Sequence, residues 1–243
     1  MARGQPDWQV PDYDLSGVQV DVADTADRIL GFSRSDTRGR VHYLDTFSDG
    51  IDGYILGITG AAATPVPKVA TRYGGPGPVH IELDAGDVLS DVSTMQRKFW
   101  LGSAKRLGIE LCVTFDQDSG DFDTTLSFDR VGGNADAAIL RWSRAARQWQ
   151  VWNATAFVSV VGGPDVSTDP MFFLTVKLVY DYEAGIYKRL LLGEIQYSLE
   201  SIGIGVGPDA ETGGAYVQLV SRSAGAGKGV ARVHYLIFTK DEP

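Results

Sequence analysis

The densest group of acidic side chains lies in the stretch FDQDSGDFD, which contains Asp116, Asp118, Asp121 and Asp123. A hard cation such as Ca²⁺ prefers several oxygens that converge from one loop. The spacing is not that of an EF-hand, and in an extended strand some of these side chains would point to opposite faces. Because Asp, Ser and Gly also form turns, we prefer to interpret this cluster as a solvated hairpin turn.

A second pair of carboxylates, Glu194 and Glu200, raises the question of glycoside hydrolysis. A retaining glycosidase needs two carboxyl groups about 5–5.5 Å apart across the scissile bond. In this chain Gln196 stands where an intervening acid would be expected, and the second Glu follows six residues after the first. The sequence also lacks a Gly-x-Ser-x-Gly elbow and a P-loop pattern. We therefore predict that the protein is not an enzyme and that both glutamates are exposed strand ends.

Tryptophans and arginines are concentrated between residues 141 and 152, where Arg141, Trp142, Arg144, Arg147, Trp149 and Trp152 occur. Sugar rings stack on aromatic side chains while polar neighbours bond the hydroxyl groups. Trp149 lies between two glutamines and is predicted to be exposed, whereas core or edge packing is the stronger interpretation for Trp142 and Trp152. The candidate glycan-binding residues are Trp149, Arg147 and Trp142.

The elements that must position these residues are short strands separated by Gly, Pro and Asp turns. Strands are predicted at about 41–47, 54–59, 68–73, 78–84, 96–102, 107–116, 121–130, 136–142, 147–153, 155–161, 171–181, 186–192, 194–200, 214–221 and 231–239. No helical pattern of 10–15 residues separates them, which favours antiparallel pairing over βαβ units. The sequence therefore predicts an all-β protein with two stacked antiparallel sheets.

Composition narrows the classes of partner. The chain has 243 residues, 44% hydrophobic and 22% charged, with 29 glycines, which is enough apolar material for one large core. A net charge of −9 disfavours attraction to a phosphate backbone, so no nucleic acid is expected as a partner. No stretch approaches the roughly 18 apolar residues of a membrane span, and the start of the chain has no apolar leader. We expect no membrane association.

Residues 1–39 differ in character from the rest of the chain. They contain two prolines, scattered Asp residues and one weakly helical patch at 22–32. We predict an N-terminal arm with a short helix over 1–39 and a single β-sandwich domain over 40–243. Trp8 and Tyr13 are the arm residues expected to pack on the same sandwich or on a neighbouring subunit.

Several segments together resemble concanavalin A/laminin G-like β-sandwich domains of uncharacterised bacterial and phage-type proteins. They are VHYLDTFSDGIDGY, LGIELCVTFD, TTLSFDR, LRWSRAARQWQVWN, FFLTVKLVYDYEAGIYKRLLLGEIQYSLESIGI and ARVHYLIFTKDEP. The resemblance implies a jelly-roll sandwich of two antiparallel sheets. It also makes Asp45 and Asp49 candidate ligands of a structural calcium. The last strand lacks the carboxylate pair that is common there, so we predict no cofactor.

The start MARGQPDW is similar to the N-termini of proteins encoded among phage structural genes. The resemblance implies a virion structural protein, such as a capsid decoration or tail-associated protein, that forms a homo-oligomer and attaches to a larger protein shell. The alternative is a carbohydrate-binding module that recognises glycans through exposed aromatic side chains. The expected location is the virion or the cytoplasm. Both functional hypotheses stay open at the level of sequence.

Overall fold

The computed structural model describes residues 39–47, 50–60, 68–71, 79–99, 105–115, 119–130, 134–160, 173–208, 214–223 and 230–243. The predicted arm and helix, including Trp8 and Tyr13, lie outside the described residues. Within the described residues every regular element is a strand, and no helix is long and apolar enough to cross a membrane.

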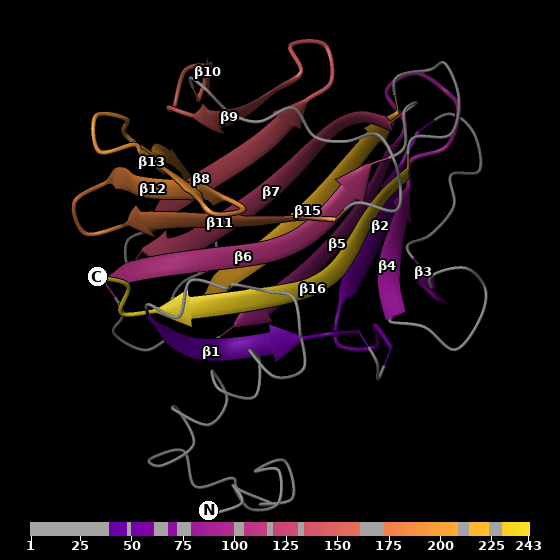
Figure 1. Ribbon diagram of the computed structural model, residues 1–243, viewed down its shortest axis with the longest axis horizontal. Coiled ribbons are helices and arrows are strands. Elements are labelled where there is room, and N and C mark those ends of the chain that lie inside the picture. Colours follow the sequence, from indigo (N-terminus) through magenta and orange to yellow (C-terminus); the bar gives the residue numbers. More distant parts are fainter. Residues whose placement is uncertain are drawn as a thin grey trace, which may run out of the picture.

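The strands form two eight-stranded antiparallel sheets that stack as layers (Figure 1). In spatial order, sheet A contains β13 (Ile195–Ser198), β12 (Ile186–Leu192), β11 (Leu174–Asp181), β6 (Arg106–Phe115), β16 (Val230–Lys240), β4 (Val79–Asp84) and β3 (Lys68–Thr71), and β1 (Arg40–Asp45) also pairs with β16. Sheet B contains β10 (Phe157–Ser159), β9 (Gln148–Trp152), β8 (Asn134–Ser143), β7 (Ser119–Arg130), β15 (Ala215–Ser223), β5 (Val92–Phe99) and β2 (Ile55–Thr59), and β14 (Gly205–Pro208) also pairs with β8.

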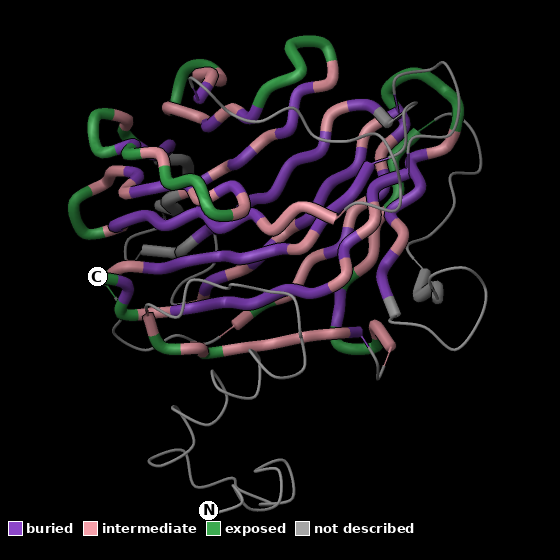
Figure 2. The backbone as a smooth tube through the Cα atoms, in the orientation of Figure 1, coloured by how far each residue is buried: buried purple, intermediate pink, exposed green. Residues whose placement is uncertain are grey.

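The core lies between the two sheets because strand residues alternate between faces. Leu107, Ile109 and Leu111 of β6 point inward from sheet A, while Phe122 and Leu126 of β7 point inward from sheet B. Figure 2 shows buried residues along the middle of the strands and exposed residues at the hairpin turns. Each fully buried aliphatic or aromatic side chain contributes about 1.5–3 kcal/mol. The outward positions of the same strands are therefore available for polar side chains.

Fifteen strands were predicted, and each overlaps a strand of the structure, but two details differ. β5 runs from Val92 to Phe99, whereas the prediction placed it at 96–102. β14, with the sequence GVGP, is absent from the predicted strands. It pairs with residues 134–137 of β8 through its backbone. Glycine is required at position 205, since a Cβ there would lie 2.9 Å from Cδ1 of Trp152.

A buried tyrosine links the two sheets. β9 pairs with residues 140–143 of β8 and β14 pairs with residues 134–137, which leaves a gap at that edge. The hydroxyl of Tyr187, on β12 of sheet A, accepts a hydrogen bond from the Ile139 backbone N–H at 2.9 Å and donates to the Trp152 carbonyl at 2.8 Å. The hydroxyl thereby satisfies backbone groups that would otherwise be buried without partners.

The C-terminal residues fold back onto sheet A and bury a charged cluster. The Glu242 carboxylate contacts Lys177 Nζ at 2.8 Å and Arg189 Nη2 at 2.6 Å, and it also accepts a hydrogen bond from the Thr239 hydroxyl. The side chains of Lys177, Arg189 and Glu242 are 1%, 8% and 0% exposed. Arg189 also donates to the Pro243 carbonyl at 2.8 Å. Each of these buried charges is stabilised by its oppositely charged partner, so removal of one leaves the other buried without compensation.

A turn joins β11 and β12, between the strands predicted at 171–181 and 186–192. Gly185 has a φ of 68°, a conformation that glycine adopts readily. Asp181 accepts hydrogen bonds from the Ala184 N–H and from Arg106 Nε, each at 2.9 Å. Burial by itself raises the pKa of Asp181, but these hydrogen bonds and the charge of Arg106 lower the pKa overall.

Candidate functional site

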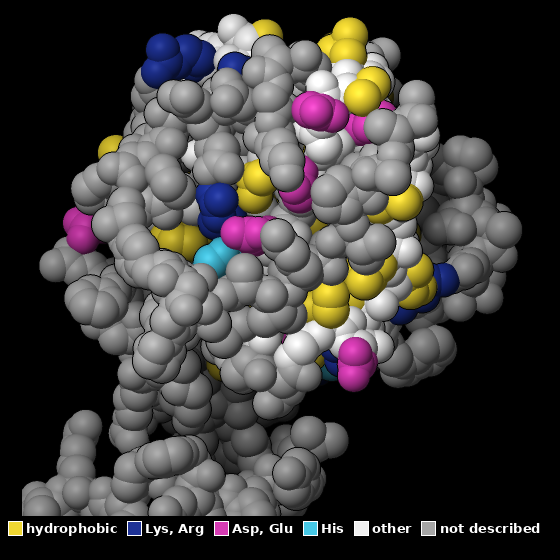
Figure 3. Space-filling model, turned by 90° about the vertical axis from the view of Figure 1, so that its right-hand side faces the viewer, with side chains coloured by type: hydrophobic (Ala, Val, Ile, Leu, Met, Phe, Trp, Pro, Cys, Tyr) yellow, Lys and Arg dark blue, Asp and Glu magenta, His cyan; other side chains and the backbone are white. Residues whose placement is uncertain are grey.

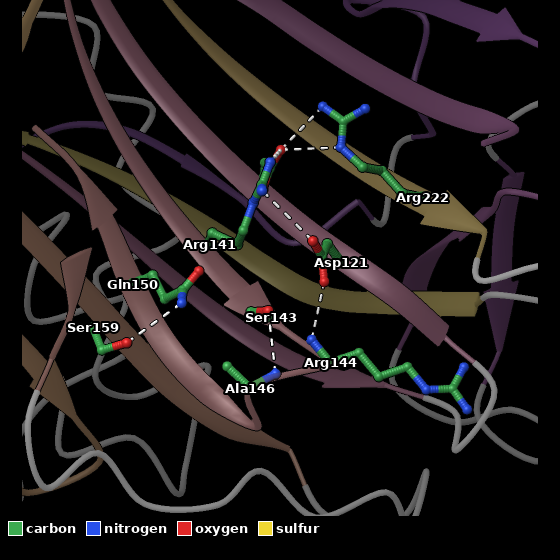
Figure 4. A network of polar contacts seen from close by, with 9 residues as sticks. Asp121, Arg141, Ser143, Arg144, Ala146, Gln150, Ser159 and Arg222 are labelled. Carbon is green, nitrogen blue, oxygen red and sulfur yellow. Dashed lines mark hydrogen bonds and ion pairs between the residues drawn. The ribbon is translucent and has the colours of Figure 1, made fainter. Parts of the chain in front are cut away.

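The outer face of sheet B carries a row of charged side chains from three neighbouring strands. Asp121 and Asp123 of β7 point away from the core, because Phe122 between them points into it. The strand register sets Asp123 opposite Arg141 of β8. Arg222 of β15 reaches the same carboxylate from the other side, as Figure 4 shows for the Arg222 and Arg141 guanidinium groups. We call Asp121, Asp123, Arg141 and Arg222 the charged row.

Asp123 is the fixed centre of the charged row. Its Oδ1 accepts a hydrogen bond from Arg141 Nε at 2.6 Å. Its Oδ2 accepts from Arg141 Nη2 at 2.9 Å and from Arg222 Nε and Nη2 at 3.2 and 3.1 Å. The Asp123 side chain is 6% exposed, whereas that of Arg222 is 42% exposed. Asp123 therefore orients two guanidinium groups and has little capacity left to bind a ligand itself.

The Arg141 side chain is fixed by two carboxylates and by an aromatic ring. Burial by itself lowers the pKa of Arg141, but the hydrogen bonds to Asp123 and the charges of Asp123 and Asp121 raise that pKa overall, so the side chain stays charged. Its guanidinium lies over the Phe157 ring of β10, 3.7 Å from the ring centroid. Such a cation–π contact fixes the plane of the guanidinium on the aromatic face. On the same outer face, Gln150 Nε2 donates a hydrogen bond to the Ser159 hydroxyl oxygen at 3.4 Å (Figure 4).

A cavity of about 540 Å³ opens at one end of the charged row. Described residues that line it include Ser90, Asp121, Arg144, Ala145, Arg222 and Ser223. Arg144 lies in the turn between β8 and β9, and its backbone N–H donates to Asp121 Oδ1 at 3.0 Å (Figure 4). Leu89, at the rim, is 69% exposed. The cavity therefore combines hydrogen-bond donors, a carboxylate acceptor and the apolar side chains of Leu89 and Ala145.

The predicted aromatic platform does not form. Trp149 is 1% exposed and Trp142 is 6% exposed, and both pack with Phe115 in the core. The expected exposure of Trp149 is wrong because alternation sends its two glutamine neighbours outward and the indole inward. A buried ring cannot stack on a sugar. Arg147 is exposed in the turn between β8 and β9, where its φ is 50°.

The candidate calcium ligand Asp45 is engaged by other groups. Its carboxylate accepts hydrogen bonds from the Tyr43 hydroxyl, from the Tyr54 hydroxyl at 2.8 Å and from the Phe47 N–H at 2.6 Å. Burial, together with the hydrogen bond to Asp45, raises the pKa of Tyr43 to about 12. Arg97 lies 4.4 Å from the centroid of the Tyr43 ring. Tyr43 and Asp45 of β1 are thus linked to β5 through the contact between the Tyr43 ring and Arg97.

The second candidate ligand, Asp49, lies outside the described residues. No group of three or more His, Cys, Asp or Glu side chains that could hold a metal ion occurs in the described part of the chain. Asp116 and Asp118 also fall outside it. Asp121 and Asp123 lie within β7, so the solvated hairpin turn is wrong for these two residues.

Glu194 and Glu200 are both exposed, as predicted. Glu200 contacts Lys188 Nζ at 2.6 Å, and the hydrogen bond and charge of that lysine lower the pKa of Glu200.

The sequence did not indicate that Arg222 belongs to the site. Arg222 is 99 residues from Asp123 and reaches it only because β15 pairs with β7. The available signal was the Asp-x-Asp spacing of Asp121 and Asp123 on a predicted strand, which places both carboxylates on one face.

Comparisons with known proteins concern the fold. No family model matches the chain, and no curated protein matches it. Similar solved structures include the cellulose induced protein Cip1, at 9% identity and a TM-score of 0.52, covering 82% of this chain and 97% of that chain. Lectin I-B4 from Griffonia simplicifolia, in its metal-free form, has 12% identity and a TM-score of 0.49, covering 82% and 98%. A carbohydrate esterase from the Shiga toxin-encoding bacteriophage phi24B has 11% identity and a TM-score of 0.49, covering 82% and 97%.

The chain is thus an all-β sandwich of two antiparallel sheets, which confirms the predicted fold class, while the predicted N-terminal helix lies outside the described residues.

Proposed function

We propose that this protein is a non-catalytic carbohydrate-binding sandwich whose ligand occupies the cavity at the end of the charged row. The proposal rests on a cavity of about 540 Å³ lined by Arg144 and by Arg222, whose guanidinium group Asp123 already orients. Small-molecule sites commonly have volumes of roughly 300–1,000 Å³. The space suits one or two sugar rings.

The chemistry of the wall fits a polyhydroxylated ligand. Arg222 and Arg144 supply N–H donors, the Asp121 carboxylate accepts hydrogen bonds, and Leu89 offers an apolar contact for the C–H groups of a sugar ring. Because Asp123 holds Arg222 in place, little side-chain freedom is lost on binding. Such preorganisation favours affinity for a small, polar ligand.

The positions of the histidines support a non-catalytic role. The sequence has three histidines, and His42, His80 and His234 lie on β1, β4 and β16 of sheet A. The cavity lies on the outer face of sheet B, where Ser90 and Ser223 are the lining hydroxyls among the described residues. A serine nucleophile needs a base within hydrogen-bond reach, which none of these histidines provides.

A pair of matched variants tests the proposal. Ala145 and Ala146 are adjacent, exposed residues of the turn between β8 and β9, and of the two only Ala145 lines the cavity. Ala145→Trp fills the cavity and should abolish binding on an array of neutral and acidic oligosaccharides. Ala146→Trp adds the same bulk outside it and should bind like the unmodified protein. Equal glycan binding by both variants, or no binding by the unmodified protein, would overturn the proposal.

Assembly is the second candidate function, and the edge strand β2 favours it. Among the described strands β2 pairs only with β5, and its Ile55 and Ile58 are 57% and 47% exposed. β2 lies on the side of the molecule shown in Figure 3, where hydrophobic side chains are visible at the surface. An edge strand with apolar side chains can pair with another chain. We extend this proposal to a homo-oligomer on a larger protein shell of a phage-type virion.

Light scattering coupled to size-exclusion chromatography tests assembly. The full chain should elute as a defined oligomer, and Ile55→Lys should shift it to the monomer because a charge on an edge strand opposes pairing. Ile195→Lys, on the exposed strand β13 of sheet A, is the matched control and should leave the oligomer intact. A monomeric full chain would refute this second function without affecting carbohydrate binding.

A further inference from the structure

We infer that the cavity selects acidic sugars, with Arg222 receiving the carboxylate of a uronic acid residue through the edge of its guanidinium that does not face Asp123. This inference rests on the proposed carbohydrate-binding function and specifies the ligand class for that site.

The charge of the cavity is opposite to that of the protein. The chain as a whole carries a net charge of −9. The charged side chains that line the cavity, among the described residues, are Arg144, Arg222 and Asp121, an excess of one positive charge. Asp123 and Arg141, just beyond the wall, form an ion pair with each other and leave this excess unchanged. An anionic ligand would therefore be attracted to this site, whereas the rest of the protein repels it.

The remaining hydrogen-bond donors of Arg222 determine the form of anion that fits. A guanidinium has five N–H donors, and Arg222 directs two nitrogens, Nε and Nη2, at Asp123. Its Nη1 has no hydrogen bond to a described residue. The Nη1 and Nη2 edge thus offers two parallel N–H groups to a second, planar carboxylate. A lysine could not do this, because its ammonium is a point charge without a fork.

Asp121 can accept hydrogen bonds from the hydroxyl groups of the same sugar ring. Its Oδ1 accepts the Arg144 N–H at 3.0 Å, and its Oδ2 lies 3.5 Å from Arg141 Nη1, so Oδ2 retains capacity to accept hydrogen bonds. A donor edge on Arg222 and an acceptor on Asp121 in one cavity match a ring that carries both a carboxylate and hydroxyls. A simple carboxylate without hydroxyls would use only the arginine.

The test compares each acid with its own methyl ester. Isothermal titration calorimetry measures binding of the full chain to short oligomers of galacturonic, glucuronic and mannuronic acid and to the fully methyl-esterified form of each. Esterification removes the charge and keeps the ring hydroxyls. We expect at least one acid to bind about 10- to 100-fold more tightly than its ester, the range for a hydrogen bond to a charged group.

Variants of Arg222 identify the side chain that recognises the acid. Arg222→Lys should weaken binding of that acid about 10-fold and Arg222→Gln more, because the fork and then the charge are lost. Lys105→Gln removes an exposed cation next to β6 of sheet A, away from the cavity, and should leave affinity unchanged. The unfolding midpoint of each variant verifies folding, and the comparison of acid with ester needs no variant at all.

The outcomes separate the two proposals. Tight binding of an acid that Arg222→Lys weakens supports the inference. Equal binding of acid and ester that Ala145→Trp abolishes overturns acid selection but leaves carbohydrate binding in this cavity intact. Absence of binding to every acid, ester and neutral oligosaccharide overturns both.

Discussion

Removal of the buried Glu242 carboxylate should strongly destabilise the sandwich. The substitution Glu242→Gln keeps the size of the side chain and deletes its charge. Lys177 and Arg189 both contact this carboxylate, and both are less than 10% exposed. The change therefore leaves two cations on the outer face of sheet A without the anion that they share.

The expected loss of stability in Glu242→Gln follows from the burial of the charged side chains around it. Breaking a buried ion pair by removing one partner costs about 3–5 kcal/mol, since the remaining charge is poorly solvated. For a domain of this size, 1 kcal/mol corresponds to about 2–4 °C in Tm, which gives a decrease of roughly 6–20 °C. A surface pair would behave differently, because solvent screens it.

Differential scanning calorimetry and urea denaturation measure this loss directly. Glu200→Gln is the matched control, because Glu200 also contacts a lysine but is 59% exposed, and it should leave the midpoint unchanged. A coupling energy between Glu242→Gln and Lys177→Met in a double-mutant cycle would assign the effect to the contact. An unfolding midpoint for Glu242→Gln equal to that of the unmodified protein would mean that this cluster does not hold the C-terminal residues in place.

Three further substitutions test other parts of the fold. Tyr187→Phe removes the hydroxyl that bonds the backbones of Ile139 and Trp152, so the free energy of unfolding measured in urea should fall by about 2–4 kcal/mol; a change below 0.5 kcal/mol would contradict the bridging role. Gly205→Ala places a methyl group 2.9 Å from the Trp152 ring and should cost about 1–3 kcal/mol, with a change in tryptophan fluorescence; an unchanged spectrum and midpoint would count against this packing. Because the folded state lowers the pKa of Asp181, its carboxylate stabilises the fold above the ordinary pKa of 3.8 and loses that contribution as pH falls further. Asp181→Asn should therefore be less stable than the unmodified protein at pH 7, and the difference should shrink in melts below pH 3.8; a constant difference would be inconsistent with this linkage.

Local patterns were sufficient to predict most of the strands. Alternating apolar residues and turn signals reflect interactions between neighbours in sequence, so the hairpin of β11 and β12 with its turn at Gly185 was predictable. β14 was missed because Gly205 has no side chain to show alternation. Its strand character comes from backbone pairing with β8 and from the close approach of the Trp152 ring.

The site was less accessible to sequence reasoning. Polar neighbours led to the prediction that Trp149 is exposed, yet on a strand the neighbours of a buried residue point outward. The acidic cluster was noticed, but the partner that gives Asp123 its role comes from β15. Pairing between strands about 100 residues apart depends on the topology of the whole sheet, which no local pattern encodes.

Chemical-shift mapping shows directly whether the cavity on the outer face of sheet B binds an acidic sugar. The full chain is titrated with the uronic acid oligomer that binds most tightly, and backbone amide and arginine Nε–Hε signals are followed. Saturable shifts are expected at Ser90, Asp121, Arg144 and Arg222, which line the cavity. Saturable shifts confined to another surface, or no saturable shift with any uronic acid oligomer, would contradict binding of an acidic sugar in this cavity.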